Sequence, residues 1–369
     1  MKLIKLFTLI ISAAAFVACG GDSNGDDKHT PKGNVKFTAD CVSVEINHPI
    51  TFTVIAEDGT DITAEATIMD KTDNRFVIVP NPYTPTEDGE YTFFASGANF
   101  ISSEIKVNVV PSIPALPIDA QPENTSFYHR ILLVDHSGTT CSYCPEMMKI
   151  LKELEEGDYH DKYYEVVSHS FNSNDPASSD AAYFVKGHFG ISSYPSLTYN
   201  FYHDTISSHQ GGAAAVKTQI NKLWKAEGAN VGIAATTSLA TKCVVVNTEV
   251  KAAATNDYRI TAWLLQDGIE ATQSGGSADW MHIHNNALRQ RVNVNAISGI
   301  DLGNIVAGET KTTALTLDIS KKKWELKNES KNNFKVLIIV SEKNSKGKFD
   351  VANVVLCPID ESITYNYIE

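Results

Sequence analysis

The stretch ILLVDHSGTTCSYCPEMMKILKEL, residues 131–154, joins an apolar run to a pair of cysteines and then to a helical pattern. The first residues are continuously apolar, as in a buried strand. After the cysteines, Met147, Leu151 and Leu154 recur at helical spacing and share one face. The stretch therefore predicts a strand, a Cys-x-x-Cys pair, and a helix that begins on the first cysteine, Cys141.

This order of elements can make a cysteine reactive. Cys141 would lie at the helix N-terminus, where the helix dipole and free N–H groups stabilise a thiolate. Cys144, one turn later, would lie beneath it and close a disulfide once Cys141 has attacked a partner. Pro145 fits the first turn, because residues there need no N–H donor. The pair is a candidate redox centre.

Two further positions bear on this chemistry. Asp135 ends the apolar strand, and its carboxylate is either buried, where it could accept the proton that Cys144 must lose, or exposed to water. Pro195 follows Tyr194 and precedes an apolar run. A cis-proline turn packed against the cysteines would offer backbone groups to an extended partner chain.

Two other uses of the pair have to be weighed. A structural zinc site needs four ligands, and the histidines near the pair, His136, His160 and His169, lack finger-like spacing. We therefore expect no metal and no organic cofactor. A structural disulfide is the stronger competitor, although so short a loop would stabilise the fold little.

The segments ILLVDHSGTTCSYCP and YPSLTYN resemble the thioredoxin superfamily over roughly residues 127–228. The resemblance implies a thioredoxin-like domain in which Cys141 exchanges disulfides with protein thiols and Cys144 resolves them. Asp135 would assist proton transfer. Pro195 with Tyr194 would position the partner chain. The residues that precede the two cysteines, Thr140 and Tyr143, would contact that chain.

The sequence departs from the thioredoxin pattern at three places. Thr140 stands where thioredoxins carry tryptophan, and Lys149 replaces a proline that kinks the helix. The dipeptide between the cysteines, Ser142-Tyr143, lacks the histidine of strongly oxidising members. We therefore expect a reduction potential of the cysteine pair that is not extreme, and a substrate surface that differs from that of thioredoxins. The direction of electron flow stays open.

The N-terminus has the pattern of an export signal. Lys2 and Lys5 precede an apolar run that ends in small residues at Cys19, which resembles a bacterial lipobox. An ordinary signal peptide with an incidental cysteine is the alternative. The polar residues 19–33 would form a solvated tether. We expect an outer-membrane lipoprotein on the cell surface or the periplasmic face.

The chain also resembles a narrower group, the Bacteroidetes 28-kilodalton outer-membrane lipoprotein family. This resemblance rests on HSGTTCSYCPEM, WLLQDGI and HNNALRQ within residues 127–369. It implies a second function, that of a surface adhesin or receptor that keeps the thioredoxin-like domain as a scaffold. The formal charge of −13 disfavours nucleic acid as a partner. The ligand and the oligomeric state stay open.

Short alternating strands flank the cysteine-bearing segment on both sides. The length and the 43% hydrophobic content allow two or three cores. The expected fold is therefore multidomain, α/β plus all-β. The predicted divisions are a signal peptide (1–18), a tether (19–33), an immunoglobulin-like β-sandwich (34–112), a Pro-rich linker (113–126), the thioredoxin-like domain (127–228) and a C-terminal β-sandwich (229–369).

Three other cysteines and two histidines call for interpretation. Cys243 and Cys357 lie on predicted strands of one block and either form a disulfide or are small buried residues. Cys41 has no evident partner, so a buried free thiol is expected. His282 and His284 alternate, which permits metal binding, but without a third ligand they are more simply polar strand residues.

Overall fold

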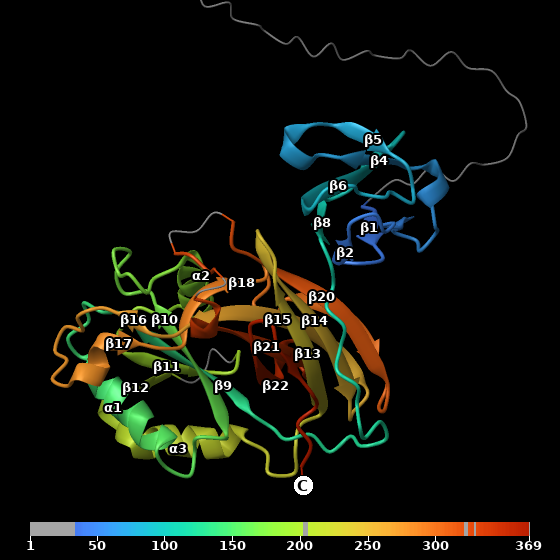
Figure 1. Cartoon of the computed structure of the whole chain (residues 1–369). Coiled ribbons are helices and arrows are strands. Elements are labelled where there is room, and N and C mark those ends of the chain that lie inside the picture. Colours follow the sequence, from blue (N-terminus) through green and yellow to red (C-terminus); the bar gives the residue numbers. More distant parts are fainter. Residues whose placement is uncertain (1–33, 202–205, 321–323, 328–329, 369) are drawn as a thin grey trace, which may run out of the picture.

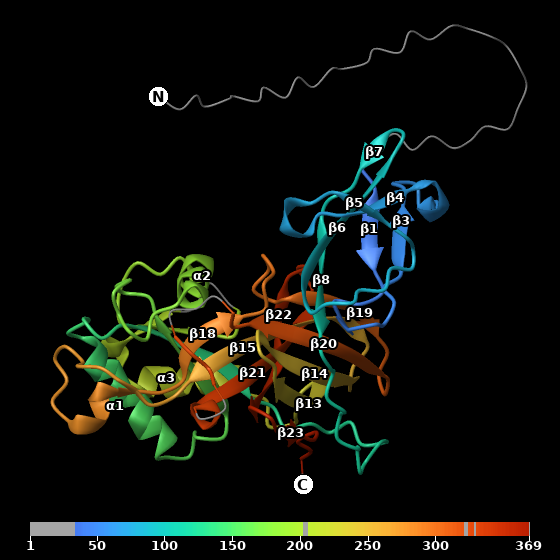
Figure 2. The ribbon, with the colours of Figure 1, turned by 45° about the horizontal axis from the view of Figure 1, so that its top comes forward.

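The computed structural model describes residues 34–201, 206–320, 324–327 and 330–368. The predicted signal peptide (1–18), the lipidation site Cys19 and the tether (19–33) lie outside the described residues. Strands dominate, and Figures 1 and 2 show a small N-terminal module in blue beside a larger body. The expectation of a β-rich, multidomain chain is thus confirmed. Within the described ranges, no helix is both long and apolar enough to cross a membrane.

The N-terminal module encloses a core of its own, in which the rings of Phe52 and Phe93 lie 4.8 Å apart. The core is covered by two sheets, as a sandwich requires, whereas the immunoglobulin-like connectivity stays a prediction. One sheet holds β1 (Lys36–Ala39) and β3 (Phe52–Ile55); the other holds β2 (Ser43–Glu45), β8 (Ile105–Val110), β6 (Gly89–Gly97), β4 (Thr67–Asp70) and β5 (Val77–Val79) in that order, with β7 (Phe100–Ile101) beside β6.

The larger body is built on one nine-stranded sheet that runs through both the central and the C-terminal segments. The two segments join where β10 pairs in parallel with β18, Val167 opposite Ala287. The strands are, in spatial order, β12 (Ile206–Ser208), β11 (Ser196–Tyr199), β9 (Ile131–Ser137), β10 (Tyr163–His169), β18 (Ala287–Arg291), β15 (Asn256–Gln266), β21 (Phe334–Lys343) and β22 (Phe349–Pro358), with β19 (Ile300–Ile305) paired to β15.

Helices cover both faces of the sheet around β9. Ile131 and Leu133 face α1 (Cys144–Glu155) and α3 (Gly212–Leu223), and Leu132 and Val134 face α2 (Asp180–Phe189). This alternation explains why β9 reads as a continuous apolar run, since both of its faces are buried. It also places Asp135 on the α1 side, in phase with Ile131 and Leu133.

Helix α1 begins at Cys144 and not, as expected, at Cys141. The intervening residues form a tight turn, in which the N–H of Cys144 donates to the carbonyl oxygen of Cys141 at 3.3 Å. Pro145 then occupies the first turn of the helix. Cys144 is thus the first residue of the helix, whereas Cys141 lies in the turn before it and not in the helix as predicted.

The C-terminal segment has two β-layers, as a sandwich requires, but one of them is the far part of the nine-stranded sheet. The second layer covers that part across a large apolar core. A neighbouring core mixes Leu132 and Val166 of the central segment with Trp263 and Leu337 of the C-terminal segment. The second layer holds β20 (Thr310–Asp318), β14 (Cys243–Ala252), β13 (Val231–Leu239) and β23 (Ser362–Ile363), and a separate hairpin holds β16 (Ile269–Glu270) and β17 (Ile283–His284).

Candidate functional site

Cys141 and Cys144 form a disulfide at the point where β9 leads into α1, with their Cα atoms 5.4 Å apart. Cys141 is 4% exposed and Cys144 is fully buried. Only Cys141 can therefore be reached from the surface, and then only in part. This order of exposure fits the predicted roles, in which Cys141 meets the partner and Cys144 lies behind it.

Sheet register brings the predicted proline turn to the same edge. Ser196 lies opposite His136, which places Pro195 beside Ser137, the last residue of β9. The bond between Tyr194 and Pro195 is cis, as the sequence pattern predicts. The Tyr194 hydroxyl donates to the carbonyl oxygen of Ser170 at 2.9 Å, which fixes the turn to the end of β10.

The two residues predicted to contact a partner chain lie at the surface. Thr140 is exposed, and Tyr143 is 65% exposed and stacks on His209 with ring centroids 5.8 Å apart. Phe171, which is 47% exposed, packs edge-on against Tyr194. Aromatic side chains thus flank the disulfide on two sides, an arrangement suited to holding an extended chain.

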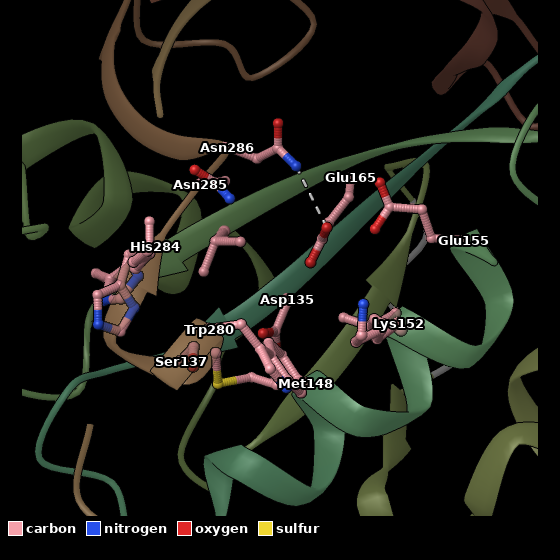
Figure 3. Close-up of a pocket in the computed structure, with 14 residues that line it drawn as sticks. Asp135, Ser137, Met148, Lys152, Glu155, Glu165, Trp280, His284, Asn285 and Asn286 are labelled. Carbon is pink, nitrogen blue, oxygen red and sulfur yellow. Dashed lines mark hydrogen bonds between the residues drawn. The ribbon is translucent and has the colours of Figure 1, made fainter. Parts of the chain in front are cut away.

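Asp135 is buried, with 2% of its surface exposed, so the water-facing alternative is wrong. Among the described residues, its Oδ1 atom has no hydrogen-bond partner. Burial, and secondarily the neighbouring Glu165, hold the pKa of Asp135 well above its usual range. The carboxyl therefore favours its protonated form. Figure 3 shows it close to Met148 of α1, with Glu165 on the neighbouring strand.

A buried aspartate that sequence reasoning missed anchors the segment before the cysteines. Asp175 accepts a hydrogen bond from the backbone N–H of Thr139 at 2.6 Å and lies 3.0 Å from Nδ1 of His169. Although burial opposes it, the bonds from His169 and from the backbone lower the pKa of Asp175 to about 2. The ionised carboxylate thereby fixes the turn that presents Cys141.

The 269–284 hairpin, which runs from β16 to β17, was not predicted from the sequence either. Figures 1 and 2 show it in orange beside α1. The Gln273 side chain is buried, and its Nε2 donates to the carbonyl oxygens of Gly138 at 3.2 Å and Cys141 at 2.9 Å. The backbone N–H of Ser274 donates to the carbonyl oxygen of Thr139 at 2.7 Å. The hairpin tip therefore lies against the cysteine loop.

The two histidines of the WMHIHNN stretch hold this hairpin together. Nδ1 of His282 accepts from the backbone N–H of Gln273 at 2.9 Å. Nε2 of His284 lies 3.1 Å from the carbonyl oxygen of Ala271, to which it donates. In the part of the chain that the structure describes, no three His, Cys, Asp or Glu side chains form a group suited to a metal ion. The two histidines therefore stabilise the hairpin through hydrogen bonds to its backbone.

The other three cysteines of the described residues, Cys41, Cys243 and Cys357, are free thiols. Cys243 lies on β14 of the second layer and Cys357 on β22 of the main sheet, so the disulfide considered between them is not formed. Burial raises the pKa of each of these two thiols to about 11 and that of Cys41 to about 12. All three are weak nucleophiles at neutral pH.

No protein-family model and no curated protein matches the sequence. Among solved structures, the chain is similar to HBP35 of Porphyromonas gingivalis, with 18% identity over 64% of this chain and 77% of that chain and a TM-score of 0.52. A domain of the outer membrane lipoprotein Omp28 from the same organism matches 37% of this chain and 93% of its own length at 18% identity. Its TM-score of 0.24 is too low to carry an argument. The likeness to HBP35 shows a shared fold.

Proposed function

We propose that this chain is an exported, lipid-anchored outer-membrane protein whose thioredoxin-like segment exchanges disulfides with protein thiols. The observation that carries the proposal is the Cys141–Cys144 disulfide at the start of α1, beside a cis-proline turn. The parallel pair β9 and β10, the antiparallel β11 and helices on both faces support a thioredoxin-like arrangement. The lipobox-like N-terminus supports the anchor.

The proposed exchange needs only thiols and protons. In the direction that oxidises the partner, a thiolate of the reduced partner attacks Sγ of Cys141. The S–S bond of the pair breaks, and Cys144 leaves as a thiolate. Protonated Asp135 supplies the proton that Cys144 takes up. A second thiolate of the partner then attacks the partner's sulfur in the mixed disulfide and releases Cys141 as a thiolate. Cys141 takes a proton from water. The partner now holds a disulfide and has lost two electrons. The reverse steps reduce a partner.

The buried state of Cys141 adds a requirement. A thiolate must approach along the S–S axis, and the loop that carries Cys141 is held by Gln273 and Ser274. We infer that the hairpin tip moves away when a partner engages, or that the partner approaches from the side of Tyr143 and Tyr194. Both routes keep the attack on Cys141 and leave Cys144 inaccessible.

Two cysteine variants test the proposal. Cys144→Ser should trap a mixed disulfide with partner thiols at Cys141, and Cys141→Ser should abolish exchange. Cys357→Ser, which removes a buried free thiol, should exchange like the parent and serves as the control. Non-reducing gels and mass spectrometry of trapped adducts give the readout. Exchange in both variants at the parental rate would overturn the proposal.

A surface binding function is the second candidate, and an apolar edge on the N-terminal module favours it. Phe76, Val77 and Ile78 are 63%, 51% and 70% exposed and lie on or just before β5, the last strand of its sheet. Exposed apolar strand edges are typical of interaction sites. If binding to a surface ligand is the function, Ile78→Asp should weaken adhesion to immobilised host cells. Ile101→Asp, at an equally exposed isoleucine on β7, should not.

A further inference from the structure

A pocket of about 290 Å³ lies between α1, the ends of β9 and β10, and the 269–284 hairpin. Its inner wall carries two carboxyl groups, Asp135 from β9 and Glu165 from β10. Met148, Leu151 and the Trp280 ring supply apolar walls. Figure 3 shows Met148 and Trp280 beside Asp135. The pocket shares Asp135 with the proposed exchange, whereas Tyr143 is not among its lining residues.

Neither carboxyl has an ion-pair partner among the described residues. Asp135 leaves Oδ1 without a hydrogen bond, and Glu165 accepts one weak bond, from Nδ2 of Asn286 at 3.3 Å. Burying such groups without compensation is costly, because water no longer solvates them. A third acceptor lies in the same lining: Nδ1 of His169 is used by Asp175, and its Nε2 has no partner.

The cations nearby are already engaged. Lys152 at the rim pairs with Glu156 at 2.6 Å and lies over the Trp280 ring at 5.4 Å. Lys335 pairs with Asp267 at 2.6 Å. The other titratable groups in the lining are Glu155, which adds negative charge, and His284, which is held by a backbone carbonyl group. Lys152, which lines the pocket, is thus held by Glu156 and the Trp280 ring, and in the described ranges it makes no ion pair with either buried carboxyl group.

We propose that this pocket binds a small organic cation, a primary ammonium with a short apolar chain. An ammonium placed between Asp135 and Glu165 would donate to both carboxyl groups and keep its third N–H for water. The apolar chain would contact Met148 and Leu151. The volume is ample for a molecule of this kind.

Binding of this cation is linked to pH. Burial raises the pKa of Glu165 to about 7, and that of Asp135 lies well above its usual range. Glu165 is largely protonated in the empty pocket at pH 6, and burial favours the protonated form of Asp135, so an ammonium must displace protons to gain ion pairs. Affinity should therefore rise between pH 6 and pH 8.

The test uses butylammonium as the probe, with butan-1-ol and butyrate as neutral and anionic matches. The full chain is titrated at pH 6 and pH 8, and the Trp280 indole N–H signal is followed by NMR. We expect butylammonium to bind at least tenfold more tightly than the alcohol at pH 8, and butyrate not to bind. Equal affinity for the alcohol, or no shift of the Trp280 signal at saturating probe, would overturn the proposal.

Variants assign the effect to the carboxyl groups. Asp135→Asn and Glu165→Gln each keep the side-chain shape and should weaken butylammonium binding at least tenfold. Glu153→Gln, at an α1 position that pairs with Lys217 outside the pocket, is the matched control. Undiminished binding in either pocket variant would contradict the proposal. If one variant fails to fold, the other decides.

Discussion

Asp135 and Glu165 are acidic residues on the sheet face that α1 covers, and this position determines their chemistry. Burial raises the pKa of both carboxyl groups, so both favour the protonated form. A carboxyl whose pKa is higher in the folded than in the unfolded state stabilises the fold below its unfolded pKa. That stability is lost as the pH rises through the folded pKa.

Glu165 therefore gives a prediction about stability. Its pKa rises from 4.5 to about 7 on folding, so its stabilising contribution should disappear between those pH values. Between pH 4.5 and pH 7.5, the free energy of unfolding should fall less in Glu165→Gln than in the parent. The difference between the two falls should be about 2 kcal/mol after allowance for the partial exposure of Glu165. Urea unfolding at both pH values measures this. A parental pH slope in Glu165→Gln would contradict it, and Glu153→Gln should keep that slope.

Local sequence was enough to place some residues of the site but not others. Cys141, Cys144 and Pro195 have signals within a few neighbours, namely the pair spacing, the helical pattern that follows it, and an aromatic-proline step before a strand. Glu165 and Gln273 have no such signal. Their roles arise from the register of β10 against β9 and from the path of a distant hairpin, and a single sequence contains neither.

At the scale of elements, the 269–284 hairpin controls access to the disulfide. Gly275 has φ +74°, and a Cβ atom there would lie 2.5 Å from the carbonyl oxygen of Ser142. Alanine at this position must push the hairpin tip away from the cysteine loop. We expect Gly275→Ala to speed reduction of the disulfide by dithiothreitol about 5–30-fold, which corresponds to one or two kcal/mol of lost contact.

Gly268→Ala is the matched control for this experiment. Gly268 has a similar φ of +70°, but no atom lies within 4 Å of its added Cβ. Both variants thus carry the same backbone strain, and only Gly275→Ala adds the clash. Equal reduction rates in the two variants would show that the hairpin tip does not limit access. Thiol trapping against time gives the rates.

For the whole molecule, the shared sheet means that the core of the central segment is not formed by its own residues alone. Its strand β10 has β18 as a neighbour, and its core includes Trp263 and Leu337. The sequence indicated a boundary near residue 228, because the pattern changes there from alternating helices and strands to strands only. Pairing across that boundary depends on the parallel β10–β18 contact, which leaves no local signal.

This shared core predicts the behaviour of fragments. Residues 127–228 alone would expose one side of β10 and the apolar surface that packs on Trp263. We expect this fragment to lack a cooperative unfolding transition, whereas residues 113–369 should unfold in one step. Circular dichroism during thermal unfolding distinguishes the two. A stable, cooperatively folded 127–228 fragment would contradict the account.

A buried lysine, Lys251, binds the linker 113–126 to the larger body. Lys251 is 2% exposed, and its Nζ contacts Asp119 at 2.5 Å, the carbonyl oxygen of Pro122 at 2.9 Å and the Tyr367 hydroxyl at 2.9 Å. Lys251→Met keeps the length but leaves these acceptors unpaired. We expect a loss of about 3 kcal/mol in stability and faster proteolysis of the linker. Urea unfolding and limited proteolysis check this, and unchanged values would contradict it.

The equilibrium of the Cys141–Cys144 pair with dithiothreitol or glutathione tests the central claim most directly. The folded chain would be equilibrated at defined redox ratios, alkylated and analysed by mass. The account predicts reversible reduction without unfolding, at a potential within about −120 to −270 mV, the range of known oxidoreductases. A potential below about −300 mV, or a disulfide that resists reduction until the chain unfolds, would identify the pair as a structural clip and favour the binding function.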